Sequence, residues 1–282
     1  MRCAEDLVLV ECLKGEAHYS AWQRTGEVCD AIVAMGLHQG NPRDADTPFW
    51  LSEMRRRLFV SAYGRDKAVA TFLGRPPRLS YRYCRIELPL DLGDSDILLE
   101  GAELDAALSA LDVNGWNTGG YFGRTTWLRA WAQHCRIRED ILEIALGSGD
   151  DDITLRAEQI RLDLQRLQRS YPEFMRLSIA DALERSPGTH LSPAVAKKRY
   201  RGNAVFTLCV HAGIGYTEFL LQRSLINRKL GTTADLIPVS RRILSLVLIA
   251  QSKNDYFRDF RTDLIYLVCD TRLRIIFSLA CH

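Results

Sequence analysis

Long apolar runs are missing from this chain of 282 residues. Its apolar stretches are short, as in Leu246–Ala250, whereas a helix that crosses a bilayer takes roughly 20 apolar residues. The first residues, Met1 to Leu7, also lack the charged and then apolar pattern of a secretory signal. The sequence therefore predicts neither a membrane-spanning helix nor a secreted protein.

Paired cysteines and a strong basic excess are missing as well. No two of the eight cysteines lie closer than nine positions, whereas zinc ligands usually come in pairs about two to four residues apart. The net charge is +2, while a DNA-binding module carries a clear basic excess on one face. We therefore expect free thiols, no zinc or other cofactor in this chain, and no direct contact of the chain with nucleic acid.

No long stretch alternates between apolar and polar residues, so helices are predicted rather than strands. Apolar residues recur at helical spacing in Trp22–Met35, and Gly36 ends that helix. Further helical segments are predicted over 3–15, 46–73, 125–146, 153–174, 205–226 and 241–250, the last of them capped by Ser240, and the stretch 264–280 is apolar. The predicted fold is an all-α bundle of antiparallel helix pairs.

The helix over 46–73 has clear start and stop signals. Thr47 can cap its first turn and Pro48 suits that turn, while Leu73-Gly74 ends the helix before Pro76-Pro77. Its predicted buried stripe, with Glu53 largely outside it, consists of Leu51, Met54, Leu58 and Ala62.

A glycine-rich segment, 114–124, divides the chain into an N-terminal part (1–113) and a C-terminal part (125–282). Four glycines in ten residues predict a loop, and no Lys-Ser or Lys-Thr follows to make a phosphate-binding P-loop. We expect both parts to belong to the same domain. In the second part, heptad spacing from Ile153 favours a core-facing bundle helix over a coiled coil, because Pro172 interrupts it.

Residues for catalysis or metal binding do not gather in any known pattern. Asp150–Asp152 lacks a second carboxylate one turn later, and its charge suits the start of a helix. His134 and Cys135 are neighbours on a helix and point in different directions. His211 lies on an otherwise apolar helix and is interpreted as a core or pocket residue rather than a metal ligand. No enzyme activity is therefore expected.

Asp66 and Arg75 are the most informative charges. Asp66 lies near the apolar face of its helix, and a buried carboxylate needs a cation or several donors. Arg56, Arg57 or Arg75 could form a forked pair with it. We favour this structural role, with an effector-binding arginine as the alternative.

Several motifs in this order resemble the regulatory middle homology domain of fungal zinc-cluster transcription factors. The resemblance is strongest over residues 3–90 and departs from the family pattern at Val60, Lys67 and Gln222. It is carried by Trp22, Gly36-Leu-His38, Glu53-Met-Arg-Arg-Arg-Leu-Phe-Val60, Tyr63-Gly-Arg-Asp-Lys67, Leu73-Gly-Arg-Pro-Pro77 and, more loosely, Leu220-Leu-Gln-Arg223.

The resemblance implies a regulatory or effector domain in the nucleus that controls transcription by RNA polymerase II. It also implies that sequence-specific DNA binding and zinc belong to an upstream six-cysteine module, which has no counterpart here. The chain is then a fragment, a truncated gene model, or a family member without that module.

Two other functions stay open, a helical scaffold or repressor without a DNA-binding module and, less favoured, an all-α metabolic enzyme. The partners expected are transcription co-regulators, a second copy of the chain and a small-molecule effector, with no membrane contact. Tyr63, Asp66, Arg75 and His211 are the candidate site residues, and an effector pocket is predicted near Arg75 and His211.

Overall fold

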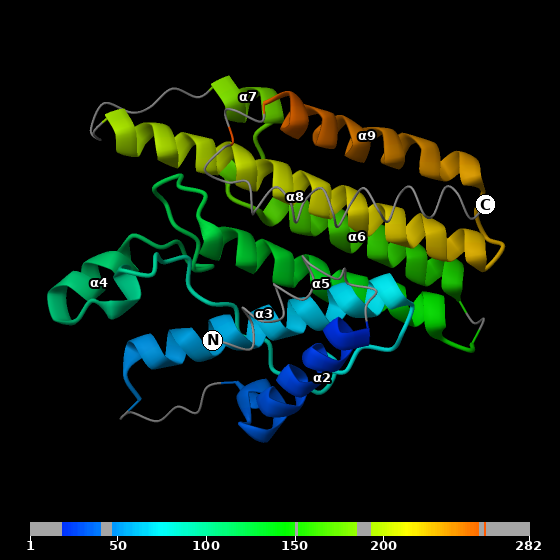
Figure 1. Ribbon diagram of the computed structural model, residues 1–282, viewed down its shortest axis with the longest axis horizontal. Coiled ribbons are helices and arrows are strands. Elements are labelled where there is room, and N and C mark those ends of the chain that lie inside the picture. The colour runs from blue at the N-terminus through cyan, green and yellow to red at the C-terminus, as the bar shows by residue number, and fades with distance from the viewer. Residues whose placement is uncertain (1–18, 41–46, 150–151, 185–192, 254–256, 258–282) are drawn as a thin grey trace. The chain divides into compact units, whose positions relative to one another are not determined.

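The computed structural model describes residues 19–40, 47–149, 152–184, 193–253 and 257, and the side chains of the helix that begins at Pro193 are described from 202 onward. Over these residues the chain forms eight α-helices and no strand (Figure 1). The all-α prediction is therefore confirmed. The segments 3–15 and 264–280 lie outside the described residues.

The chain divides into two compact units. Unit 1 consists of residues 1–116 and 128–150, and unit 2 consists of residues 117–127 and 151–282. The chain first passes from one unit to the other inside the glycine-rich segment 114–124, which forms a loop as expected. The domain limits given from the sequence stay a prediction.

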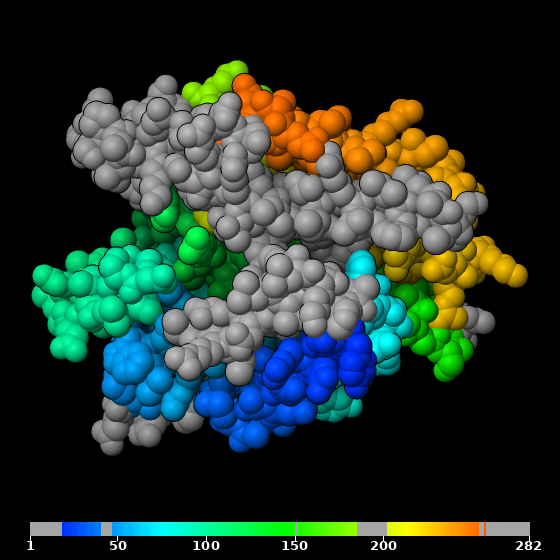
Figure 2. All heavy atoms as spheres, viewed as in Figure 1, coloured from blue at the N-terminus to red at the C-terminus, as the bar shows by residue number. Residues whose placement is uncertain are grey.

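Unit 1 is built mainly on helices α2, α3 and α5. Its elements are α2 (Tyr19–Ala34), the short 3-10 helix η1 (Leu37–Gln39), α3 (Phe49–Leu73), the 3-10 helix η2 (Asp96–Leu98), α4 (Gly101–Ser109) and, from Leu128 onward, α5 (Arg124–Leu146). No residue of α4 is buried, and Figure 2 shows this helix as a lobe at the surface. The unit 1 core consists of Cys29, Ile32, Leu37, Phe59, Val60, Ala62, Tyr63, Leu79, Ala132 and Cys135.

The close approach of α3 and α5 depends on Gly64. A Cβ atom at this position would lie 2.5 Å from the Trp131 ring, which is closer than real side chains come. The Cys135 thiol also lies 3.8 Å from the Gly64 carbonyl oxygen. The α3–α5 contact therefore requires a residue without a side chain.

Two predictions about α3 need correction, namely its first residue and its buried face. Helix α3 begins at Phe49 with Pro48 as its N-cap and with no side-chain cap, so Thr47 does not cap it. Leu58 is 36% exposed, whereas Glu53 is fully buried. Of the predicted stripe, Ala62 is buried and Leu51 and Met54 are half-buried, so apolar spacing was wrong at Leu58 and at Glu53, whose charge is buried together with its partners.

Unit 2 is organised around the long helix α8. Its elements are α6 (Ile153–Ser170), the 3-10 helix η3 (Glu173–Met175), α7 (Ile179–Glu184), α8 (Pro193–Asn227) and α9 (Thr233–Ser252), with the first residues of α5. Helix α8 packs against α6, α7 and α9, and Figure 1 shows α8 and α9 side by side.

Two predictions about α6 are confirmed. The helix begins at Ile153, directly after Asp152, and it packs in the core as a bundle helix. The heptad positions Ile153, Ala157, Ile160 and Leu164 are its buried residues.

The predicted cap of the last described helix is wrong. Helix α9 begins at Thr233, and Thr232 and Asp235 form a capping box there. Ser240 instead lies inside the helix, where it is 5% exposed. Pro238, which would be taken as a helix breaker, lies inside α9 beyond its first turn, where it cannot donate a backbone hydrogen bond.

One described segment, Gly202–Asn227 of α8, is long and apolar enough to cross a membrane by length and composition alone. Of its most apolar window, 72% is buried. A high buried share is what the central helix of a bundle shows.

Candidate functional site

Asp66 organises the turn that follows α3. The helix ends at Leu73, and Gly74 takes the left-handed conformation with φ 62°. Pro76 and Pro77 then prevent a further helical turn. The chain returns so that the backbone N–H groups of Arg78 and Leu79 donate to the Asp66 carboxylate over 2.9 to 3.1 Å.

Lys67 supplies the cation for this carboxylate. Its ammonium Nζ lies 3.0 Å from Asp66 and 3.4 Å from Glu139 of α5, and it also donates to the Leu79 carbonyl. The ammonium lies 4.2 Å from the centroid of the Tyr63 ring, a cation–π distance. Tyr63, Asp66, Lys67 and Glu139 form what we call the Asp66 cluster, and each of them is at most 2% exposed.

Glu139 ties the cluster to a third segment of unit 1. Its carboxylate accepts hydrogen bonds from the Tyr63 hydroxyl at 2.7 Å and from the Tyr81 backbone N–H at 3.2 Å. Burial, and then the negative charge of Glu139, raise the pKa of Tyr63 well above its usual range. The phenol therefore stays a neutral donor, and the cluster joins α3, α5 and the loop after α3.

The prediction that Asp66 is buried and paired with a cation is confirmed, but that cation is not an arginine. Arg56 pairs with Glu53 and Glu87, and Arg57 pairs with Asp94. Arg75 is exposed and lies 4.8 Å from the centroid of the Trp22 ring. The cation is instead the sequence neighbour Lys67, whose ammonium lies over the Tyr63 ring and 3.0 Å from Asp66.

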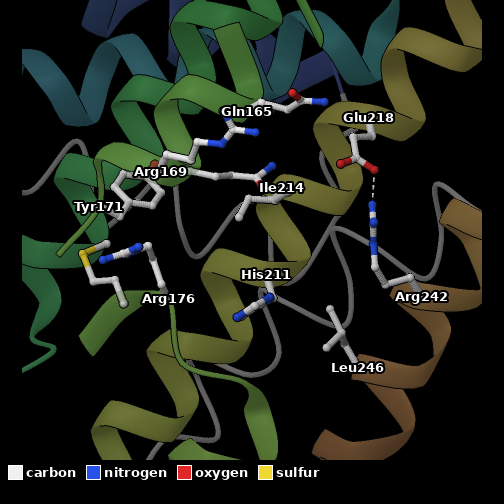
Figure 3. Close-up of a pocket in the computed structure, with 11 residues that line it drawn as sticks. Gln165, Arg169, Tyr171, Arg176, His211, Ile214, Glu218, Arg242 and Leu246 are labelled. Atoms are coloured by element: carbon white, nitrogen blue, oxygen red, sulfur yellow. Dashed lines mark hydrogen bonds and ion pairs between the residues drawn. The ribbon is translucent and has the colours of Figure 1, made fainter. Parts of the chain in front are cut away.

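A second site lies in unit 2, where a pocket of about 420 Å³ opens beside α8. Figure 3 shows its walls, which come from the end of α6, the segment after it, α8 and α9. The lining, which we call the arginine pocket, consists of Gln165, Gln168, Arg169, Tyr171, Met175, Arg176, His211, Ile214, Glu218, Arg242 and Leu246.

The charges of the arginine pocket are only partly balanced. Arg242 of α9 pairs with Glu218 of α8, which neutralises both (Figure 3). Arg169 and Arg176 are exposed, and within the described part of the chain neither guanidinium has a carboxylate within ion-pair distance. The pocket therefore carries an excess of two positive charges.

His211 stands between these two groups of charges. Its Nε2 lies 3.0 Å from the Leu177 carbonyl oxygen, and because a carbonyl only accepts, this nitrogen carries the hydrogen. His211 lines the pocket as Figure 3 shows, which agrees with its interpretation as a pocket residue.

The four candidate site residues thus fall into separate settings. Tyr63 and Asp66 belong to one cluster in unit 1, and Arg75 lies on the surface of the same unit. His211 belongs to the pocket of unit 2. A pocket shared by Arg75 and His211 stays a prediction.

Several residues of these sites were not found from the sequence. Glu139 could have been suspected, since it is a carboxylate on the same face of a predicted helix as Cys135 and Leu142. Arg169 and Arg176 carried no signal, because arginines at the end of an amphipathic helix are common. Over the described residues no three side chains of His, Cys, Asp or Glu gather in a metal-binding group.

Comparison with protein families finds a match for the first part of the chain. Residues 7–116 match the family model of the fungal specific transcription factor domain. The resemblance drawn from the sequence is therefore confirmed for this segment. No curated protein and no solved structure matches the chain.

The fungal transcription factor domain match ends at Trp116, which is also where the first segment of unit 1 ends. Asp66 and Lys67 of the Asp66 cluster lie inside the matched residues, whereas Glu139 and the arginine pocket lie outside them. The matched segment supports a role as a regulatory domain of a fungal transcription factor.

Proposed function

We propose that this chain is the regulatory part of a fungal transcription factor that acts in the nucleus and controls transcription by RNA polymerase II. Sequence-specific DNA binding and zinc binding would belong to a separate module. Co-regulators or a second copy of the chain would bind the regulatory part, which would have no enzyme activity and no direct contact with DNA.

One observation carries this proposal, namely the family match over residues 7–116. The matched segment contains the turn in which Gly74, Pro76 and Pro77 bring two backbone N–H groups to Asp66. A net charge of +2 on 282 residues also supports protein contact rather than phosphate contact.

A tethering experiment tests the regulatory role. The full chain is fused to an unrelated DNA-binding module and expressed in a fungal cell that carries a reporter gene with the matching operator. We expect the fusion to change reporter output relative to the module alone, upward for an activator and downward for a repressor. A nuclear, well-expressed fusion that leaves the reporter unchanged would contradict the proposal.

A gel-shift measurement on the isolated chain tests the second part. We expect no sequence-specific binding of duplex DNA at any salt concentration. Tight binding that weakens steeply as salt rises would mean that the chain itself neutralises phosphates, and it would overturn the assignment of DNA binding to another module.

A further inference from the structure

We propose that the arginine pocket of unit 2 binds a small organic anion, a carboxylate attached to an apolar body. The binding itself stands on the geometry of unit 2, and a regulatory effect of that ligand would rest on the proposed function. The pocket lies outside the residues that match the family model, so the family match does not assign it.

The first argument is charge. Arg169 and Arg176 contribute two guanidinium groups to one pocket, and no described carboxylate neutralises either of them. A guanidinium presents a fork of N–H donors that matches a carboxylate in two parallel hydrogen bonds. Two such groups in one lining favour an anion there over a neutral or cationic molecule.

The second argument is the state of the opposite wall. Glu218 would repel an anion if it were free, but Arg242 holds it in an ion pair across α8 and α9 (Figure 3). Cancelling this charge leaves the apolar side chains Ile214 and Leu246 as the neighbours of the ligand body. The pocket therefore has a cationic side and a largely apolar side.

The third argument is size. A volume of about 420 Å³ falls within the range of roughly 300–1,000 Å³ that small-molecule sites occupy. Tyr171, Met175, Ile214 and Leu246 give the cavity more apolar contact than an inorganic ion could use. A molecule with one carboxylate and an aromatic or aliphatic body satisfies both sides of the pocket, while inorganic phosphate satisfies only one.

Direct titration of the purified full chain tests this inference without any transcription readout. The probes are phenylacetate and octanoate as amphipathic carboxylates, phenylacetamide as the uncharged counterpart of the first, and inorganic phosphate as a bare anion. Isothermal titration calorimetry at low salt should show binding of at least one carboxylate, with phenylacetamide and phosphate each at least about tenfold weaker, which corresponds to about 1.4 kcal/mol.

Two variants locate the binding. The double variant Arg169→Gln with Arg176→Gln should weaken carboxylate binding by at least about tenfold. The matched control is Arg166→Gln, which removes an exposed arginine of the same helix that pairs with Asp163 and does not line the pocket. This control should bind as the unchanged protein does, and circular dichroism shows that each variant is folded.

Each remaining outcome overturns the inference. It is wrong if neither carboxylate binds, if phenylacetamide binds as tightly as phenylacetate, or if the double variant binds like the control. Phosphate that binds as well as the carboxylates would remove the apolar half of the proposal. Because none of these results involves DNA or a reporter, they are distinguishable from a failure of the proposed function.

Discussion

The Asp66 cluster and the arginine pocket differ in whether their charged groups are paired. In the Asp66 cluster of unit 1, the buried ammonium of Lys67 meets two carboxylates, and the Asp66 carboxylate also meets two backbone N–H groups. In the arginine pocket of unit 2, Arg169 and Arg176 are exposed beside a hollow and face no described carboxylate.

This difference distinguishes a site that stabilises the fold from a site that can bind a ligand. A buried charge that loses its partner costs several kcal/mol, so the fold depends on such a cluster. The charged groups of the cluster are already paired within the protein and are not available to a ligand. An exposed arginine costs little to leave without a partner, so its charge stays available. The comparison predicts large stability effects in the first site and almost none in the second.

The largest expected effect is that of Asp66→Ala. The substitution removes the nearer carboxylate from the buried Lys67 ammonium and leaves the N–H groups of Arg78 and Leu79 without their acceptor. We expect a loss of about 3–5 kcal/mol in the free energy of unfolding. Urea unfolding followed by tryptophan fluorescence measures it, since Trp22, Trp50, Trp116 and Trp131 all lie in unit 1.

The matched control for this variant is Glu27→Gln. Glu27 pairs with Arg24 on the surface of α2, where both side chains are more than half exposed. We expect a change of at most about 1 kcal/mol. If Asp66→Ala cost no more than this control, the carboxylate would not be buried among donors as described.

The next effect concerns acid stability and His134. This histidine is 2% exposed, and burial, followed by the like charge of Arg138, lowers its pKa to about 3. The unfolded chain binds a proton near pH 6.5 and the folded chain does not, so the free energy of unfolding falls as pH drops below that value. From pH 7 to pH 5 the loss from this residue is about 2 kcal/mol.

The variant His134→Gln tests this pH dependence because glutamine does not titrate. We expect its unfolding free energy to change less between pH 7 and pH 5 than that of the unchanged protein, by about 2 kcal/mol. Parallel pH profiles for the two proteins would mean that His134 takes up a proton in the folded state. Unit 1 would then hold a buried cation at His134 without the carboxylates that surround Lys67.

The local features of unit 1 could be predicted from the sequence, while its long-range pairings could not. Gly74 and the two prolines specify the end of α3 by backbone geometry alone, and the end is where the sequence put it. The partner Glu139 lies in another helix far along the chain, and no local pattern connects it with Lys67. The burial of Glu53 was missed because one of its donors, the backbone N–H of Leu90, lies far along the chain, although the other, Arg56, is one turn away.

In unit 2 the heptad spacing of α6 predicted its buried face, because that face is apolar throughout. The pocket could not be predicted, since a cavity is defined by what three helices and a loop leave unfilled. From the sequence, His211 was singled out as a polar residue on an apolar helix and as part of a predicted effector pocket with Arg75. Arg169 and Arg176 beside His211 can be recognised as candidate binding residues only from the structure, which shows that no described carboxylate pairs with them.

A smaller effect is expected at the start of α9, which checks that ordinary helix energetics hold in unit 2. Thr232→Ala removes one half of the capping box and should cost about 1 kcal/mol. Ser240→Ala should change stability by less than about 0.5 kcal/mol, because among the described residues its buried hydroxyl has no hydrogen-bond partner. Thermal unfolding followed by far-UV circular dichroism compares the two, and a larger cost at Ser240 would mean that this hydroxyl is bonded.

The smallest effect is expected from the arginine pocket itself. Arg169→Gln with Arg176→Gln should change the free energy of unfolding by no more than about 0.5 kcal/mol, because no described ion pair is lost and two like charges are removed from one pocket lining. Arg242→Gln, which breaks the pair between the half-exposed Arg242 and the less exposed Glu218, should cost more, up to about 1 kcal/mol. If the double variant proved the less stable of the two, Arg169 and Arg176 would be structural residues like Lys67, and the contrast between the two sites would fail.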